Sequence, residues 1–245
     1  MYIFDVIEKL QTMIDASKRI VFFGGAGVST ESGLPDFRSA DGLYSQKYKY
    51  PPEIMLSRTF FDRHTKEFFD FYRDKLLLPD AKPNAAHHKL AELEAAGRLI
   101  AVITQNIDGL HQAAGSRNVL ELHGSIHRNI CMNCRKSYGI SAMLESSGIP
   151  HCTCGGIIKP DVVLYEEGLD SEVLRQSIEM LSRADMLIIG GTSLVVYPAA
   201  GLINEFNGNH LVLINRDPGQ FDERADLVIH RPIGEVLEQI VVQVI

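Results

Sequence analysis

The sequence predicts an α/β fold built on a doubly wound parallel sheet. Two patterns lead to this prediction: short apolar runs rich in β-forming residues recur along the chain, and apolar residues at helical spacing recur between them. Strands that alternate with helices pair in parallel through right-handed crossovers. The expected strands are residues 19–23, 99–104, 119–124, 162–165, 184–189 and 211–214. The expected helices are residues 3–16, 59–77, 85–96, 171–183, 199–206 and 233–243.

The composition is typical of a globular protein and argues against two classes of partner. The 245 residues suffice for one large α/β domain, or for one domain with a small insert, and 45% of them are hydrophobic. A net charge of −7 and the lack of a basic stripe disfavour binding to nucleic acid. No window holds the roughly 18 consecutive apolar residues of a membrane span, and the first residues do not resemble a signal peptide. We therefore expect a cytoplasmic monomer with no nucleic-acid or membrane partner.

A glycine-rich stretch follows the first expected strand and is the first candidate ligand site. The run Gly25–Gly27 lets the backbone turn tightly, so that its amides can face an anion such as a pyrophosphate. The usual dinucleotide fingerprint is incomplete, because the next glycine, Gly33, comes too late. The run Asp36–Arg38 then places an acid, an aromatic ring and a guanidinium after a proline-stiffened turn. Taken alone, this stretch is equally compatible with an ordinary glycine turn.

A second glycine loop strengthens the case for a nucleotide. The run Gly190–Ser193 follows a strand, and Asn215 ends the next strand, with Asp217 close by. Nucleotide-binding βαβ units place a phosphate loop and then a ribose-binding side chain in this order, although asparagine here replaces the usual acid. Two such loops in one chain indicate a dinucleotide.

Polar side chains also gather at the ends of two other strands. Gln105, Asn106 and Asp108 follow the strand at 99–104, and ligands of doubly wound sheets bind at the carboxyl ends of strands. A histidine at such a place can accept a proton near neutral pH. Two histidines qualify, His111 and His123, and their spacing does not decide between them.

The four cysteines predict a structural zinc ion. They form the pattern Cys131-x-x-Cys134 and, after seventeen residues, Cys152-x-Cys154. Four thiolates in two close pairs suit tetrahedral zinc, and they leave no open position for catalysis. His151 is a possible competing ligand, and four free thiols are the alternative to a metal site.

Two segments between the first strand and residue 80 interrupt the α/β alternation. Residues 39–60 have loop composition, and we expect either a mobile cover over the ligand or a plain surface insertion. Residues 59–77 carry many aromatic residues at helical spacing and predict the core of a small helical module.

Taken together, these motifs resemble the sirtuin family of NAD-dependent protein-lysine deacylases, of the bacterial type. The resemblance runs from about residue 18 to about residue 217. Its motifs are Gly25–Ser29, Ser32–Arg38, Thr104–Asp108, His123-Gly124, the paired cysteines, Gly191–Ser193 and Asn215, in family order.

The resemblance implies an NAD-dependent protein-lysine deacetylase that transfers acetyl from acetyl-lysine to ADP-ribose and releases nicotinamide. Its cofactors would be NAD and one structural zinc, and its partners acetylated proteins or peptides. It implies a Rossmann-like NAD domain at 1–38, 81–124 and 160–245. The smaller part would contain a loop and helical module at 39–80 and a zinc module at 125–159. An acyl-lysine tunnel would lie between the two parts.

The resemblance also assigns roles to residues. His123 would be the general base that activates a ribose hydroxyl, with Asn106 and Asp108 positioning the nicotinamide ribose. Phe37, Val163 and Tyr165 would contact the acyl-lysine substrate. The residues expected to bind NAD are Gly25, Ala26, Gly27, Ser29, Thr30, Asp36, Phe37, Arg38, Gln105, Asn106, Asp108, His123, Gly191, Thr192, Ser193, Asn215, Arg216 and Asp217.

The chain departs from the family pattern in ways that bear on substrate choice. Gly24 stands where the family usually has threonine, and the second cysteine pair is one residue shorter than usual. The family's Phe-Gly-Glu appears as the run Tyr165–Glu167, so Glu166 replaces a glycine in the segment that pairs with substrate. Family members that prefer acidic acyl groups carry Tyr-x-x-Arg, whereas this chain has Tyr72 and Lys75. Lysine lacks the bidentate fork of arginine, and we therefore expect acetyl to be preferred.

Other activities remain open from the sequence alone. Removal of other acyl groups and mono-ADP-ribosyl transfer would use the same motifs. A zinc-ribbon protein that only senses NAD is a third possibility, although a sensor needs no base such as His123.

Overall fold

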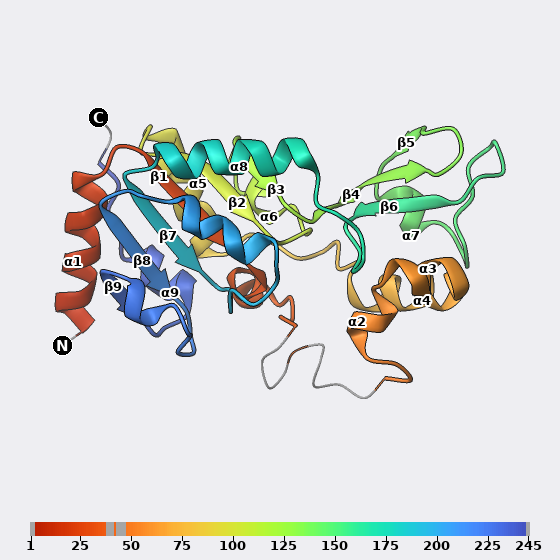
Figure 1. The fold of residues 1–245 in the computed structure, drawn as a ribbon, viewed down its shortest axis with the longest axis horizontal. Helices are drawn as coiled ribbons and strands as arrows, with labels where there is room; N and C mark the ends of the chain where they lie inside the picture. The colour runs from red at the N-terminus through yellow and green to blue at the C-terminus, as the bar shows by residue number, and fades with distance from the viewer. Residues whose placement is uncertain (1–2, 38–41, 43–47, 244–245) are drawn as a thin grey trace.

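The computed structural model describes residues 3–37, 42 and 48–243, and two β-sheets organise them (Figure 1). The larger sheet has six strands in the order β3-β2-β1-β7-β8-β9, and each neighbouring pair is parallel. The strand order reverses between β1 and β7, which confirms the predicted doubly wound α/β fold. The strands are β1 Ile20–Gly24, β2 Leu99–Thr104, β3 Val119–Glu121, β7 Met186–Gly190, β8 His210–Ile214 and β9 Leu227–Ile229.

The two faces of this sheet bury alternate side chains, as period-2 strands must. In β1, Phe22 joins the core under the helices α1 (Ile3–Ala16), α5 (Ala85–Ala95) and α9 (Ile233–Glu238). Val21 and Phe23 join the core under α8 (Ser171–Arg183) and the 3-10 helix η4 (Ala199–Glu205). All three side chains are fully buried. Helices therefore cover both faces, and the carboxyl end of the sheet remains the edge where ligand-binding loops can lie (Figure 1).

Side-chain caps begin two of the covering helices. Asn84 accepts hydrogen bonds from Ala86 N and His87 N at the start of α5, and Asp170 caps α8 in the same way. None of the helices in the described ranges is long and apolar enough to cross a membrane. The α-helices are α1 Ile3–Ala16, α2 Pro52–Met55, α3 Arg58–Arg63, α4 Thr65–Lys75, α5 Ala85–Ala95, α6 Leu110–Ala113, α7 Ser141–Leu144, α8 Ser171–Arg183 and α9 Ile233–Glu238. The 3-10 segments are η1 Ala26–Val28, η2 Thr30–Ser32, η4 Ala199–Glu205 and η5 Asp222–Arg224.

The smaller sheet lies at the other end of the molecule, beside α2, α3 and α4 (Figure 1). Its strands are β4 Gly124–Cys131, β5 Ser137–Tyr138 and β6 Ile158–Val162, paired antiparallel in the order β5-β4-β6. A third buried cluster joins this sheet to the aromatic helices, and it includes Phe61 and Phe68 from the helices with Ile126 and Ile158 from the sheet. The aromatic residues at 59–77 are thus core residues, as predicted.

Several elements differ from the sequence-based prediction. The helix expected at 59–77 is divided at His64 into α3 and α4, and the strand expected at 119–124 ends at Glu121. The strand expected at 162–165 lies at 158–162 and belongs to the small sheet, where Pro160 is accommodated because β6 is an edge strand. The last helix ends at Glu238, since the β-branched run 240–242 does not favour a helix. Residues 199–205 form a 3-10 helix in place of an α-helix. Residues 39–41 and 43–47 of the loop expected at 39–60 lie outside the described residues, so its role as a cover stays a prediction. The later part of this segment is not a loop throughout, because residues 52–55 form α2 and residues 58–60 begin α3.

Candidate functional site

The two glycine loops predicted from separate motifs pack directly against each other. Strands β1 and β7 are neighbours in register, so both end at the same level, at Gly24 and Gly190. Gly27 N then donates a 2.8 Å hydrogen bond to Gly191 O. A Cβ on Gly27 would lie 2.8 Å from Gly191 Cα, and one on Gly191 would lie 2.3 Å from Val28 N. These glycines therefore allow two backbone turns to meet at the carboxyl edge of the sheet.

Side chains from two further strands tie this edge together. Gln105 follows β2, and its Nε2 donates to Thr192 Oγ1 at 3.0 Å. Thr192 N in turn donates to Asn215 Oδ1 at 3.0 Å, just beyond β8. Gln105 N also donates to Gly24 O. The expected NAD residues at the ends of β1, β2, β7 and β8 thus form one connected edge.

Ser29 links the first glycine loop to the polar cluster after β2. Its Oγ donates to Asp108 Oδ2 at 2.7 Å and accepts from Asn106 Nδ2 at 3.0 Å. Ser29 and Asn106 are buried, and Asp108 also accepts from Leu110 N. Burial raises the pKa of Asp108, while the hydrogen bonds from Leu110 and Ser29 and the nearby His127 oppose that rise. The Ser29 hydroxyl therefore fixes the Asn106 amide and the Asp108 carboxylate in one orientation relative to each other.

The geometry favours His123 over His111 as a base. His123 Nδ1 lies 2.9 Å from Gln105 O, which can only accept, so Nδ1 carries the hydrogen and Nε2 has the free electron pair. Burial is the main cause that lowers the pKa of His123, and the imidazole is therefore neutral at neutral pH. His111, in contrast, is only 1% exposed and packs against Phe22 and His87. Its ring cannot reach a ligand.

The expected substrate segment begins beside His123. Val163 N donates to His123 O at 3.0 Å. Tyr165 then pairs with the start of the helical module, since its N donates to Leu56 O and its O accepts from Arg58 N. An open hollow of about 400 Å³ is bordered by Tyr165 and Glu166 on one side and by residues of α2 and α3 on the other.

The four cysteines meet at the far end of the small sheet. Their sulfurs all lie within 4.8 Å of one another, with Cys131 Sγ 3.5 Å from Cys154 Sγ and Cys134 Sγ 3.6 Å from Cys152 Sγ. Tetrahedral zinc with Zn–S bonds of about 2.3 Å requires sulfurs about 3.8 Å apart, so the arrangement fits a structural zinc ion.

The groups around the sulfurs support this interpretation. Tyr138 OH donates to Cys152 Sγ at 2.9 Å, and Cys134 N approaches Cys131 Sγ at 3.5 Å. Donors of this kind orient thiolate ligands. His151 Nδ1 instead lies 3.3 Å from Gly155 O, and His151 is not part of the sulfur cluster.

The comparison with protein families is decisive. The model of the Sir2 family matches residues 25–198, which is most of the chain and includes both glycine loops, the polar cluster and the cysteines. The chain belongs to the Sir2 family.

Individual relatives agree with this assignment. An NAD-dependent protein deacetylase of Clostridium acetobutylicum is 59% identical over 245 residues, which cover 98% of this Sir2-family chain and all of the relative. A solved Sir2 structure with a p53 peptide and NAD+ has a TM-score of 0.84 and 39% identity, covering 95% of this chain and 96% of that one. A second, with a deacetylated p53 peptide and 3'-O-acetyl ADP-ribose, has a TM-score of 0.87 and 39% identity, covering 94% and 95%.

The side chains of some residues predicted for the NAD site are exposed or have other partners than the connected edge of this Sir2-family chain. Arg216 and Asp217 pair with each other at 3.5 Å with side chains 58% and 77% exposed, and Ser193 is exposed. Thr30 Oγ1 turns back to Gly27 O. Arg38 lies outside the described residues.

Three further members of the predicted set lie in or just after the first glycine loop. Ala26 opens the 3-10 turn η1 within the first glycine loop, and Asp36 is half-buried. Phe37 is half-buried and packs on the third core cluster, which includes the aromatic helices.

Sequence reasoning missed two supporting residues of the Sir2-family site. Tyr138 gave no signal, because a tyrosine four residues from a cysteine is common in any loop. His127, whose Nε2 lies 3.0 Å from Asp108 O, could have been suspected from its place just after His123-Gly124.

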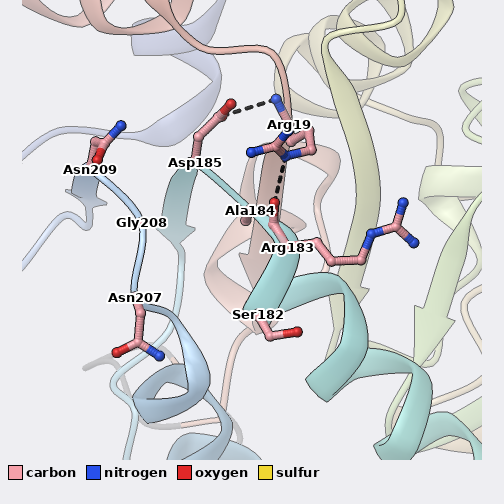
Figure 2. A pocket seen from close by; sticks show the side chains of 8 residues that line it. All are labelled: Arg19, Ser182, Arg183, Ala184, Asp185, Asn207, Gly208 and Asn209. Atoms are coloured by element: carbon pink, nitrogen blue, oxygen red, sulfur yellow. Dashed lines mark hydrogen bonds between the residues drawn. The ribbon is translucent and has the colours of Figure 1, made fainter.

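A further hollow lies away from the Sir2-family site (Figure 2). It measures about 480 Å³ and sits at the amino ends of β1 and β7, the edge opposite the glycine loops. The Asp185 carboxylate accepts a hydrogen bond from Arg19 N, and Arg19 Nε donates to Arg183 O at 2.6 Å. The Asp185 carboxylate and the Arg19 guanidinium, which line this hollow, therefore already have hydrogen-bond partners. None of the predicted site residues that the structure describes lines it.

Proposed function

We propose that this chain is an NAD-dependent protein-lysine deacetylase, which transfers acetyl from acetyl-lysine to ADP-ribose with release of nicotinamide. The observation that carries the proposal is the protonation and hydrogen bonding of the His123 imidazole. Its Nδ1 hydrogen is held by Gln105 O, and its Nε2 has no hydrogen-bond partner within the described part of the chain. Such a neutral imidazole at the carboxyl edge of the sheet is suited to take a proton. The deacetylase relatives and the Sir2 complexes with NAD+ and peptide support the same activity.

In this proposal the residues of the connected edge bind and orient the cofactor. NAD, when bound, supplies the ribose carbon from which nicotinamide leaves and the hydroxyl that becomes acetylated. The loops at Gly25–Gly27 and Gly191–Thr192 would hold its phosphates, because both follow neighbouring strands at the carboxyl edge of the sheet. Asn106 and Asp108, which Ser29 holds by hydrogen bonds, would position the nicotinamide ribose. Orientation and exclusion of water by this edge supply the catalytic advantage, together with one base.

The zinc ion has a structural role in this proposal. Cys131, Cys134, Cys152 and Cys154 would hold it as thiolates and complete its shell. The cluster lies in the small sheet, and β4 connects it to the His123 region of the chain. We propose that this sheet and the helices α2–α4 form the smaller part of the protein, while the six-stranded sheet forms the NAD part. The boundary predicted at residue 160 would then move past Val162, because β6 crosses it.

The proposed substrates are acetylated proteins or peptides, with Phe37, Val163 and Tyr165 contacting the acyl-lysine. Preference for acetyl over acidic acyl groups agrees with the place of Tyr72, which is fully buried, and of Lys75, which pairs with Asp74. We also propose a cytoplasmic monomer without nucleic-acid or membrane partners, in keeping with the net charge of −7.

The test is to incubate the pure protein with an acetyl-lysine peptide, with and without NAD, and to follow nicotinamide and deacetylated peptide. Stoichiometric formation of both, only with NAD, is expected. Nicotinamide release without peptide deacetylation would favour hydrolysis or ADP-ribosyl transfer. Absence of turnover with acetyl, succinyl and longer acyl peptides would favour a protein that only binds NAD.

A further inference from the structure

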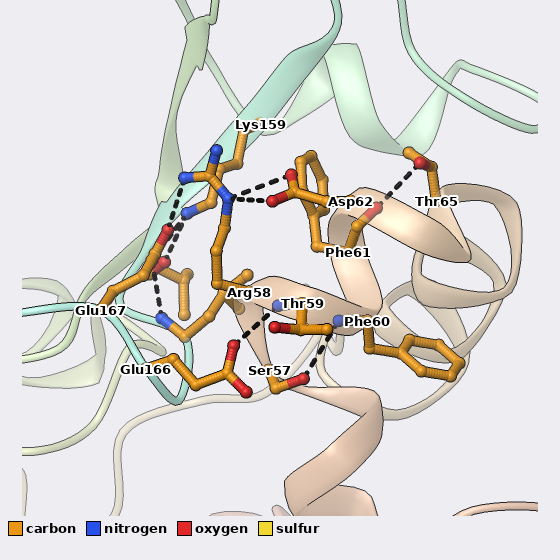
Figure 3. Close-up of polar contacts among 12 residues, drawn as sticks. Ser57, Arg58, Thr59, Phe60, Phe61, Asp62, Thr65, Lys159, Glu166 and Glu167 are labelled. Carbon is orange, nitrogen blue, oxygen red and sulfur yellow. Dashed lines mark hydrogen bonds and ion pairs between the residues drawn. The ribbon is translucent and has the colours of Figure 1, made fainter.

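Two adjacent carboxylates hold the segment 163–167 against the helical module (Figure 3). Glu167 Oε2 accepts from Leu164 N at 2.9 Å and from Lys159 Nζ at 3.1 Å, while its Oε1 accepts from Arg58 NH1 at 3.1 Å. One side chain thus joins β6, the start of α3 and the segment itself. Leu164 and Tyr165 lie next in the chain to Val163, whose amide reaches His123.

Lys159 and Arg58 are held by further contacts, so Glu167 meets cations in fixed positions. Lys159 Nζ also donates to Val162 O at 2.9 Å, and only 15% of its side chain is exposed. Burial lowers the pKa of Lys159, and the charge of Glu167 opposes that change. Arg58 Nε contacts both carboxylate oxygens of Asp62, at 3.1 and 3.0 Å. The network is therefore a connected set of directional bonds with little freedom.

Glu166 fixes the same segment from its other side. Its backbone is left-handed, with φ +77°, a conformation that costs a non-glycine residue energy. Its Oε2 accepts from Thr59 N at 2.8 Å, in the first turn of α3. The departure from the family's glycine thus adds a bond to α3, and this bond helps to keep the residue in the left-handed region.

A network of this kind is better suited to fixing geometry than to adding stability. Taking an ammonium and a carboxylate out of water costs much of what their attraction returns, and apolar replacements are often no less stable. What directional bonds provide is a single orientation of the groups they hold. The groups held here are the backbone of Leu164 and the turn after it, next to the proposed contacts Val163 and Tyr165.

We infer that Glu167, with Lys159 and Arg58, is a positioning group that presets the segment 163–166 for the acetyl-lysine peptide and thereby sets the KM for the peptide. The inference rests on the proposed deacetylase function. If the segment 163–166 is already ordered, the peptide can bind without first ordering it, and the free-energy cost of association is lower. The network makes no contact with the described residues of the NAD edge, so NAD binding and the turnover of bound peptide should not depend on it.

The test compares Glu167→Gln and Lys159→Met with the wild type in steady-state deacetylation. Each variant should raise the KM for the peptide about tenfold, which is about 1.4 kcal/mol, and change kcat and the KM for NAD less than twofold. The double variant should be little worse than either single one, because both remove the same contact. Lys66→Met is the matched control, since Lys66 pairs with Asp70 in the open, and it should leave all constants unchanged.

A readout in the free protein separates the inference from the function. Hydrogen exchange of the Leu164 amide, which donates to Glu167, should quicken in Glu167→Gln and remain slow in the Lys66→Met control. If the wild type does not deacetylate any acyl peptide, the proposed function fails whatever the exchange shows. If the wild type is active but the variants lose kcat and keep the peptide KM, or if Leu164 exchange is unchanged, the positioning role is wrong.

Discussion

Replacement of Ser29 by alanine should destabilise the protein through the two groups its hydroxyl serves. Ser29 is 2% exposed, so water cannot take the place of the lost oxygen. The change leaves a buried Asn106 donor unpaired, at about 1–3 kcal/mol, and removes a hydrogen bond to a carboxylate, worth about 1.5–3 kcal/mol. Since the two effects overlap in one site, we expect a loss of about 3 kcal/mol in the free energy of unfolding. For a chain of this length the melting temperature should fall by about 6–12 °C.

The loss should depend on pH in a definite direction. Burial already raises the pKa of Asp108 in the folded protein, and removal of the Ser29 proton donor raises it further. A carboxyl group whose folded pKa lies above its unfolded value favours the folded state at low pH, and this contribution is lost as the pH rises through the folded pKa. The penalty of Ser29→Ala should therefore grow between pH 4 and pH 7.

Urea denaturation followed by circular dichroism at several pH values measures both effects. Ser182→Ala is the control, because its hydroxyl is exposed and donates to Glu179 O, so that its removal should cost less than about 0.5 kcal/mol. A Ser29→Ala penalty as small as that of the control would refute the bridging role. A penalty that shrinks as the pH rises would refute the account of Asp108.

Three other predictions follow from the site and the cores. His123→Ala should lower kcat by a factor of about 10²–10⁴ or more and preserve NAD binding measured by calorimetry, and near-normal turnover would contradict its role as the base. Cys154→Ser should reduce bound zinc below one ion per chain by mass spectrometry and lower the melting temperature, whereas full zinc content would show that three thiolates suffice. Burial lowers the pKa of His111 to about 3, so the folded state binds fewer protons than the unfolded state, and stability is lost as the pH falls below about 6.5. His111→Leu should remove about 2 kcal/mol of the stability lost between pH 7 and pH 5, and an unchanged difference in urea midpoints would refute this.

The sequence predicted the fold wherever local pattern and tertiary context agree. The run 19–23 reads as a strand from its apolar residues alone, and it lies at the centre of the sheet as β1. Strand β6 was misplaced because Pro160 lowers strand propensity, and only its place at an edge makes the residue acceptable. The short strand Leu227–Ile229 was missed, since three residues give no periodicity to detect.

For the candidate site, the sequence identified the local motifs but not how they are arranged in space. The glycine loops, the polar cluster and the cysteines were found because each is a local motif. Their mutual arrangement was not, since the contact of Gly27 with Gly191 and the bond of Ser29 to Asp108 join residues far apart in sequence. Spacing could not choose between His111 and His123, because the difference is one of burial. The partners of Glu167 likewise come from two distant segments.

The third core cluster also constrains how the protein can be synthesised. Phe61, Phe68, Ile158 and Leu164 all belong to this cluster. The two phenylalanines leave the ribosome long before Ile158 and Leu164 are made. Until residue 164 has been made, the helical segment 58–75 has no complete surface to cover its aromatic rings, and β1 still lacks its neighbour β7. The nascent chain therefore exposes a hydrophobic segment through much of translation, which favours capture by chaperones over early folding. The cysteines emerge within this interval, so zinc loading and burial of the phenylalanines belong to the same stage of biosynthesis.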